Sequence, residues 1–385
     1  MVIYVKTQGA RIVKEGKHLL VKKEGTVYHT LFTYKLDQVV TFGSVEITHR
    51  ALAQLMRHGI DTVFLTYNGR YVGRIASPES KNVFLHKRQY TLLDDGEFCL
   101  RFARSIVAGK LTNMATLLMR IKRTRKDSIA RQRAQEIQFL MERLAKADSV
   151  DSVRGYEGRG SALYFEGFAN GFLQDAGFRR RVRRPPTDPV NSVLSLLYTC
   201  LMNRVYAAVR IAALDPYPGF LHTLDYGRYS LVLDLMEEFR PIIVDTLTLS
   251  LFNLKILQQE DFIVEKPGAT EQTPAPYQPA PDVSKDPIGL MSFDATGEEL
   301  FDLPEQRIVD GPIDVAAPTG KYPVKLKSGA FQRVIEAFEK KLTTSFYYPP
   351  ADRKLTYADA IIYQAGHCRK VIEGEVALYQ PLLLK

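Results

Sequence analysis

The chain has 385 residues, three cysteines and a formal net charge of +9 at pH 7. One hydrophobic core rarely organises so long a chain, so at least two domains are expected. Hydrophobic residues make up 45% and charged residues 25% of the chain, which excludes a collagen-like, wholly disordered or membrane-spanning protein. Cys99, Cys200 and Cys368 form no paired pattern, and the N-terminal residues contain no apolar signal segment. We therefore expect a cytoplasmic protein.

The first 85 residues have the pattern of short strands and tight turns. Runs such as VIYVK and HLLVKK are rich in β-branched residues, and Asn68-Gly69 is typical of a two-residue hairpin turn. One helix is expected after Thr48, whose hydroxyl would cap it, and Gly59 would end it. The sequence predicts a β-rich domain at residues 1–85 and a linker at residues 86–95.

The rest of the chain, residues 96–385, has the apolar period of α-helices. Asp188-Pro189 is a cap followed by a first-turn proline, and it opens an apolar segment that ends before DPYPG. A later helix from Ser230 is expected to kink near Pro241. We predict an α+β protein whose larger second domain is all-α. A proline-rich acidic insertion is predicted at about residues 265–312.

Positive charge is concentrated in two segments. Arg101 to Arg133 contains ten Lys or Arg residues and one acidic residue, and Arg179 to Arg184 contains five arginines. Such a field attracts nucleic acid, although a charge run alone is equally compatible with a solubilising surface. The candidate DNA-binding residues are Arg120, Lys122, Arg123, Arg125, Lys126, Arg179, Arg180, Arg181, Arg183 and Arg184.

Three neighbourhoods carry candidate chemistry. Glu157 lies among glycines in a helical pattern, where each glycine costs roughly 1 kcal/mol relative to alanine, so close backbone approach is expected there. His222 follows a Pro-Gly break, where loops commonly present ligands. Asp234 and Glu237 are one helical turn apart among apolar residues, so each should be partly buried and require a cation, a hydrogen-bond donor or a metal.

Each of these residues also has a structural interpretation. His222 could be a hydrogen-bonded packing residue, and the carboxylates could form ordinary ion pairs. The alternative partners are Arg154 or Arg159 for Glu157, and Arg228 or Arg240 for Asp234 and Glu237. Taken together, however, carboxylates and an imidazole suit a Mg²⁺ or Mn²⁺ centre with positions left open for water and phosphate oxygens. Beside a basic surface, this indicates phosphoryl transfer on nucleic acid.

Four segments occur in a fixed order behind the N-terminal EITHRALAQLMRHGID: GYEGRGSALYF, RRPPTDPVNSVLSLLYT, GFLH and RYSLVLDLMEEFRPIIVD. This set resembles the CRISPR-associated spacer-acquisition integrase/endonuclease family, over roughly residues 1–264 and again from Lys321. The resemblance implies a metal held by Glu157, His222 and Glu237. It also implies a supporting role for Asp234 and a position beside the pocket for Asn191.

The resemblance further implies a prokaryotic integrase, in which a spacer DNA 3′-hydroxyl attacks a phosphodiester at the CRISPR repeat. The family's partners are double-stranded DNA with single-stranded ends, repeat DNA, a second copy of the chain and a small ferredoxin-like companion subunit. The resemblance thus implies that the β-rich domain at residues 1–85 is a dimerisation domain. Two other functions remain open at this point: a general structure-selective DNA nuclease, and an architectural DNA-binding subunit. The acidic insertion is interpreted as a tolerated surface segment or a contact for the companion.

Overall fold

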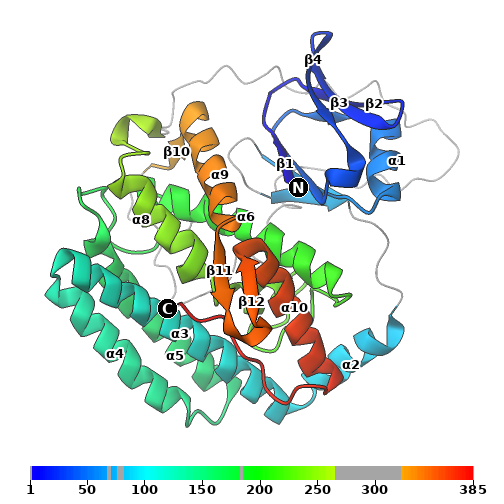
Figure 1. Cartoon of the computed structure of the whole chain (residues 1–385). Coiled ribbons are helices and arrows are strands. Elements are labelled where there is room, and N and C mark those ends of the chain that lie inside the picture. The colour runs from blue at the N-terminus through cyan, green and yellow to red at the C-terminus, as the bar shows by residue number, and fades with distance from the viewer. Residues whose placement is uncertain (1, 67–70, 76–81, 183–184, 265–321, 385) are drawn as a thin grey trace, which may run out of the picture.

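The computed structural model describes residues 2–66, 71–75, 82–182, 185–264 and 322–384. In these ranges a β-rich N-terminal part lies beside a larger, mainly helical part (Figure 1). The predicted fold class is confirmed. The elements of the N-terminal part are β1 (Val2–Val5), β2 (Arg11–Glu15), β3 (His18–Lys23), β4 (Thr26–Leu31), η1 (Thr33–Lys35), β5 (Gln38–Phe42), β6 (Glu46–Ile47), α1 (His49–Arg57), β7 (Asp61–Leu65) and β8 (Tyr71–Ile75).

The N-terminal strands form two four-stranded sheets, of order β1-β5-β7-β8 and β4-β3-β2-β6. β1, β5 and β7 are parallel, and β8 is antiparallel to β7. All five residues of β5 are buried, because alternate side chains serve different cores. Val39 packs in the N-terminal core, whereas Val40 and Phe42 belong to the core of the helical part. The first sheet therefore joins the two parts.

Local sequence explains the N-terminal turns. The Thr48 hydroxyl caps α1 by accepting a hydrogen bond from the Ala51 amide. Gly59 has a φ of +69° immediately after that helix, a backbone conformation that glycine adopts without strain. Both predictions are confirmed. Asn68-Gly69 lies outside the described residues, although β7 and β8 on either side of it pair antiparallel.

Helices dominate the rest of the described chain. The helical elements are α2 (Val83–Leu93), α3 (Gly96–Arg125), α4 (Ser128–Leu144), α5 (Val150–Phe168), η2 (Ala169–Gly171), α6 (Pro189–Ile211), α7 (Ser230–Met236), η3 (Arg240–Asp245), α8 (Thr246–Asn253), η4 (Gln259–Asp261), α9 (Ser328–Leu342), η6 (Pro349–Ala351) and α10 (Tyr357–Glu373). Two antiparallel strand pairs accompany them, β9 (Phe262–Val264) with β10 (Val324–Leu326) and β11 (Ser345–Tyr348) with β12 (Arg353–Thr356). Residues 86–93 of the expected linker belong to α2, so the connection is helical.

α3, α4 and α5 lie side by side as a layer of long helices (Figure 1). Their close packing accounts for a glycine next to Glu157. A Cβ atom on Gly160 would lie 2.3 Å from Leu111 Cδ2, so glycine lets α5 approach α3. The close backbone approach expected from this glycine-rich segment is thus present at Gly160.

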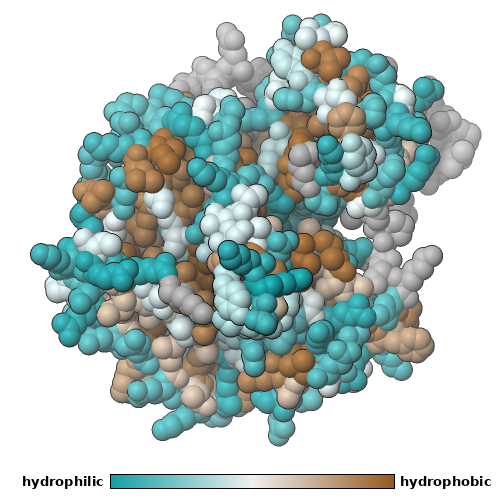
Figure 2. Space-filling model, in the orientation of Figure 1, coloured by the Kyte–Doolittle hydropathy of each residue, from teal (hydrophilic) through white to brown (hydrophobic). Residues whose placement is uncertain are grey.

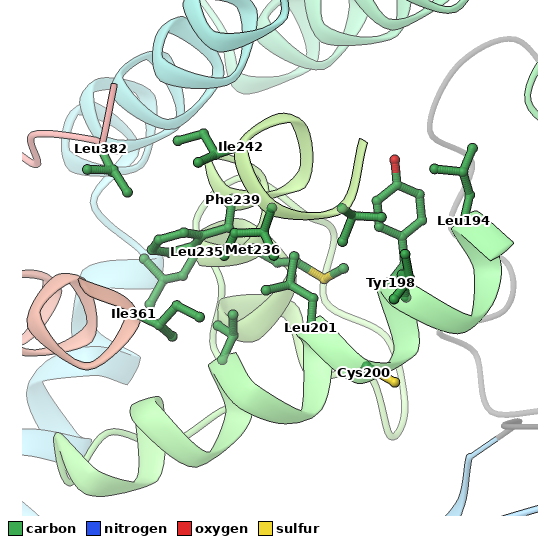
Figure 3. Packing of buried hydrophobic residues seen from close by; sticks show 14 of the residues in the cluster. Leu194, Tyr198, Cys200, Leu201, Leu235, Met236, Phe239, Ile242, Ile361 and Leu382 are labelled. Carbon is green, nitrogen blue, oxygen red and sulfur yellow. The ribbon is translucent and has the colours of Figure 1, made fainter. Parts of the chain in front are cut away.

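α6 is the central helix of the large core. The Asp188 side chain caps it and Pro189 is its first residue, as predicted. Figure 3 shows Leu201 of α6 packed toward Met236 and Phe239 of the next helical segment. Among the described residues, α6 is the one helix long and apolar enough to cross a membrane, but 67% of its most apolar stretch is buried in the protein. It is therefore a core helix.

The predicted kinked helix is three consecutive pieces, α7, η3 and α8. The bend has a local cause, because Pro241 has no backbone N–H and cannot bond to the Glu237 carbonyl. The backbone widens there into the π-helical turn η3. Turns of this kind are frequent at functional sites. Here it begins three residues after Glu237.

The C-terminal residues 375–384, called here the strap, cross the helical part and end beside α3 (Figure 1). The Asn113 side chain donates to the Leu382 carbonyl (2.8 Å) and accepts from the Leu384 amide (2.7 Å). Tyr379 donates its hydroxyl proton to Glu238 Oε1 at 2.6 Å. The strap is therefore part of the packed fold. The predicted insertion at 265–312 lies outside the described residues.

The visible surface is largely hydrophilic and is interrupted by separate hydrophobic patches (Figure 2). This agrees with the polar, charged composition. The continuous apolar surface is inside the helical part, around α6 and the segment after it.

Candidate active site

Glu157 enters the helical core from α5 and is 6% exposed. The Ser161 hydroxyl, one turn later, donates to Glu157 Oε1 at 2.7 Å. The Lys110 ammonium group of α3 contacts the same oxygen. Arg154, which the sequence offered as a partner, instead pairs with Asp151 and donates to the Leu221 carbonyl at 2.6 Å. α5 thus holds both Glu157 and the loop that carries His222.

Glu237 lies at the end of α7 and is 1% exposed. Its Oε2 is 2.5 Å from Lys110 Nζ, and its Oε1 accepts a hydrogen bond from Arg240 Nε at 3.1 Å. The ion pair with Arg240 that the sequence allowed is therefore present. Each carboxylate oxygen faces a cation, which compensates the cost of burying its charge.

Asp234 organises the loop that carries His222. This fully buried carboxylate accepts the backbone amides of Phe220, Leu221 and His222 at 2.6–2.9 Å. It also accepts His222 Nδ1–H at 2.7 Å. Because Nδ1 carries the proton, the lone pair of the neutral imidazole is on Nε2. Asp234 therefore fixes both the tautomer and the direction of the ring, as carboxylates do behind metal-bound histidines.

Glycine allows this loop to approach α7. A Cβ atom on Gly219 would lie 2.5 Å from the backbone carbon of Ser230. The Leu231 amide donates to the Pro216 carbonyl at 3.2 Å, which closes the turn. The Pro-Gly break noted in the sequence is thus what brings His222 over α7.

The three predicted ligands converge on one buried centre. His222 Nε2 is 3.9 Å from Glu237 Oε1, and the Lys110 ammonium bridges Glu237 and Glu157. In the part of the chain that the structure describes, no three His, Cys, Asp or Glu side chains have the spacing of a metal site. The ammonium group of Lys110 lies between the carboxylates of Glu157 and Glu237, at the position that a metal ion bound by both would occupy.

The donor set nevertheless fits a divalent cation. It offers two carboxylates and one neutral imidazole, the ligand types that Mg²⁺ and Mn²⁺ accept. The centre already attracts a cation, since an ammonium group occupies the space between the carboxylates. Glu157, His222 and Glu237 are therefore suitable ligands, with Asp234 behind His222.

Lys110 is the residue of this centre that sequence reasoning missed. It is 2% exposed, on a helix face that also carries Val107 and Met114. A lysine three residues after one buried apolar residue and four before another lies on the buried face of a helix. That position was the available signal, because lysine is almost never fully buried unless it is paired.

Another buried carboxylate, that of Asp245, supports the segment after Glu237. Asp245, in η3, accepts the hydroxyl protons of Tyr164 (2.7 Å) and Tyr198 (2.6 Å). Burial raises the pKa of Asp245 to about 6, while these hydrogen bonds act in the opposite direction. Burial also raises the pKa of both tyrosines well above the usual value, so they remain donors. The two hydrogen bonds fix η3 against α5 and α6.

Asn191 does not contact the three candidate ligands in the hydrogen bonds of the described residues. Its side chain accepts from Arg181 (2.8 Å) and from the Val182 amide (2.9 Å), and it donates to Asp188. It therefore ties the basic segment to the start of α6. The Arg181 guanidinium lies 5.4 Å from the Tyr198 ring centroid.

The two basic segments meet at one pocket. Arg125, at the end of α3, and Arg179 line it together with Asn170 and Gln174. Arg123, Arg125, Lys126, Arg179 and Arg180 are exposed, Arg120, Lys122 and Arg181 are half-buried, and Arg183 and Arg184 lie outside the described residues. The fold thus brings together two charged segments that are about fifty residues apart in the sequence.

Comparison with known proteins identifies the family of the chain. The sequence model of the family described as CRISPR associated protein Cas1 matches residues 3–271. The chain belongs to the Cas1 family. It is 35% identical over 271 residues to the CRISPR-associated endonuclease Cas1 2 of Rhodospirillum rubrum, covering 68% of this chain and 78% of that protein. The resemblance stated from the sequence motifs is confirmed, and the match spans all three candidate ligands of this Cas1 chain.

Two solved structures share the fold. A casposase bound to an integration product superposes with a TM-score of 0.77 at 19% identity, covering 98% of this chain and 92% of that one. A chain of a Cas6-RT-Cas1–Cas2 complex gives a TM-score of 0.76 at 22% identity; it covers 100% of this Cas1 chain, which spans 36% of that longer polypeptide. At these identities the likeness extends to the fold.

Proposed function

We propose that this Cas1 chain is a metal-dependent DNA integrase of CRISPR adaptation. The observation that carries the proposal is the convergence of Glu157, His222 and Glu237, from three separate segments, on one buried centre. Burying that many ionisable groups is unfavourable unless each is compensated, so their concentration in one place indicates a functional site.

The reaction proposed is a transesterification. A 3′-hydroxyl of spacer DNA attacks a phosphodiester at the repeat: its oxygen forms a new bond to phosphorus and loses its proton. The bond from phosphorus to the 3′-oxygen of the target strand breaks, and that oxygen takes up a proton. A bound Mg²⁺ or Mn²⁺ supplies a Lewis acid that neutralises the phosphate and lowers the pKa of the attacking hydroxyl. Water in place of the hydroxyl gives hydrolysis at the same site.

Each residue of the centre has a separate role in the proposed reaction. Glu157 and Glu237 supply two ligand oxygens and His222 supplies Nε2. Asp234 acts through His222 by holding Nδ1–H. Arg240 orients Glu237 from its other oxygen. Lys110 acts through the two carboxylates that it bridges.

The basic surface is the proposed path of the DNA. Arg123, Arg125 and Lys126 of α3 and its end are exposed, as are Arg179 and Arg180. Arg125 and Arg179 line one pocket, together with Asp127 and Asp175. Charges of this kind contact phosphates and position a duplex without reading its sequence. We assign them to double-stranded DNA with single-stranded ends and to the repeat. Arg181 is held by Asn191 and would position the neighbouring arginines.

The proposed assembly follows the family. A homodimer of this chain, joined through the N-terminal part, would work with a small ferredoxin-like companion subunit in the cytoplasm of a prokaryotic cell. A chain of the Cas6-RT-Cas1–Cas2 complex shares this fold, and the presence of Cas2 in that complex supports the companion.

The test compares two substitutions on the same helix. Glu157→Gln keeps the size of the side chain and removes its charge; Glu166→Gln is the matched control, because Glu166 is exposed on α5. Each variant is incubated with a duplex bearing 3′-hydroxyl ends, a supercoiled plasmid and Mn²⁺ or Mg²⁺. We expect Glu157→Gln to lower joining at least about 100-fold with DNA affinity retained, because a ligand has gone.

Three results would reject this function. Equal joining by Glu157→Gln and the wild-type protein would exclude Glu157 from the centre. A wild-type protein that nicks the plasmid and never joins it would be a nuclease, and one that binds DNA without any metal-dependent product would be an architectural subunit.

A further inference from the structure

We propose that Lys110 occupies the position of the metal ion when no metal is bound. Its ammonium group holds Glu157 and Glu237 together in the metal-free protein, and a divalent ion must displace it to bind. This inference rests on the proposed metal site and deepens it, since it assigns a role to a residue outside the ligand set.

The position of Lys110 is the first argument. It is 2% exposed on α3, whereas the two carboxylates come from α5 and from the end of α7. Among the ion pairs of the described residues, Lys110 is the cation that contacts both carboxylates. One ammonium group therefore connects three segments of the core at the centre of the site.

The charge balance is the second argument. Among the contacts of the described residues, the carboxylates of Glu157, Asp234 and Glu237 lie with the two cations Lys110 and Arg240, and the buried carboxylate of Asp245 also interacts electrostatically with both cations. Without Lys110, Glu157 and Glu237 would face each other with one cation fewer, and like charges in a low-dielectric interior repel strongly. The metal-free pocket therefore depends on Lys110 for its shape.

Competition follows from the same positions. An ammonium group and a divalent ion cannot both lie between the same two carboxylates, because their positive charges would repel at short range. Arg240 differs, since it pairs with Glu237 Oε1 while Lys110 lies at Oε2. Lys110 thus preserves the pocket before the metal binds and weakens the binding of the metal itself.

The experiment measures metal binding and stability without any DNA. Lys110→Met keeps most of the side-chain volume and removes the charge, and Lys146→Met is the control because Lys146 is exposed at the end of α4. The Mn²⁺ affinity of each full-length protein is measured by calorimetry. The melting temperature of each is measured in EDTA and then in saturating Mn²⁺.

We expect Lys110→Met to lower the melting temperature in EDTA by about 5 °C or more, since two buried carboxylates lose their shared partner. We expect it to bind Mn²⁺ at least about tenfold more tightly and to gain more thermal stability from Mn²⁺ than the wild-type protein. Lys146→Met should match the wild-type protein in all three measurements. Unchanged or weaker Mn²⁺ binding by Lys110→Met would overturn the inference.

A second variant covers the case in which Lys110→Met does not fold. Lys110→Met combined with Glu157→Gln removes one charge of each sign, so it should fold and melt above the single Lys110 variant. A double variant that is no more stable than the single one would also overturn the inference. Absence of Mn²⁺ binding by the wild-type protein would instead reject the proposed function, and this inference with it.

Discussion

The N-terminal part and the helical part bury different kinds of residue. The polar residues buried in the N-terminal part are uncharged, namely Thr33, Gln38, Thr41, Gln54 and Thr62. The helical part buries charged residues, namely Lys110, Glu157, Asp188, Arg228, Asp234, Glu237, Glu238 and Asp245. Both parts belong to one described fold and share a contact through β5.

The difference separates a structural core from a functional one. Apolar burial stabilises a fold at roughly 25 cal/mol per Å², whereas a buried charge is unfavourable unless it is paired. The core of the N-terminal part around Leu19 is built by the first means, and the ion pair between Arg74 and Asp61 (3.6 Å) lies on the side that faces Asn203 of the helical part. In the helical part, Lys110, Glu157, Asp234 and Glu237 converge on one centre, so the unfavourable burial is concentrated where chemistry is proposed.

The sharpest way to test that distinction is Asp234→Asn. The amide cannot accept all four hydrogen bonds of Asp234, so the loop and the His222 tautomer lose their support. We expect joining and hydrolysis to fall about 100-fold, together with a rise in the Mn²⁺ dissociation constant. Asp94→Asn, at an exposed position after α2, is the control for plasmid and calorimetric assays. Unaltered Mn²⁺ binding would show that Asp234 has only a structural role.

Leu19→Ala, in the N-terminal core, should lower stability and leave metal binding unchanged. Leu19 is fully buried in that core, so we expect the free energy of unfolding to fall by about 3 kcal/mol through lost burial and a cavity. Mn²⁺ affinity should stay the same. Urea unfolding and calorimetry measure the two quantities, and Leu254→Ala, at a leucine 71% exposed in the helical part, should change neither. A shift in Mn²⁺ affinity with Leu19→Ala would break the separation between the two cores.

The smallest expected effect concerns pH and Asp245. Its pKa in the folded protein is about 6, above the unfolded value of about 3.9. A raised carboxyl pKa means that the folded state binds the proton more tightly, so its contribution to stability is present at low pH and is lost as pH rises through about 6. Between pH 5 and 8 this amounts to about 1.5 kcal/mol.

Asp245→Asn should remove that pH dependence. The amide remains uncharged throughout, so the melting temperature of the variant should vary less between pH 5 and 8 than that of the wild-type protein. Asp94→Asn again serves as the control, and both are measured in EDTA. A variant with an undiminished pH slope would show that Asp245 does not titrate in this range.

Local signals predicted much of the fold. The caps of α1 and α6, the helical stripes of α3 and α4, and the bend at Pro241 are confirmed because each depends on neighbours within one or two turns. α5 starts at Val150 behind the cap Ser149. Short strands such as β11 and β12 were missed, because four residues inside a helical region give no clear period.

The candidate site was predictable in part. Glu157, His222 and Glu237 were selected through the ordered motifs, and the structure brings them together. Lys110 was not found. Its place in the apolar stripe of α3 indicates burial, but its partners Glu157 and Glu237 are too far away in the sequence for local patterns to identify them. Contacts of the strap with Asn113 span 269 and 271 residues, a separation over which local sequence patterns give no information.

The strap has a consequence for synthesis of the protein. Asn113 leaves the ribosome long before Leu382 and Leu384, its partners 269 and 271 residues later. At roughly 5–20 residues per second, that delay is on the order of 10–50 s. Until then the strap cannot pack against α3, which carries Lys110, or against Glu238, which is next to Glu237. The packing around Lys110 and Glu237 therefore cannot be completed until almost the whole chain has been synthesised.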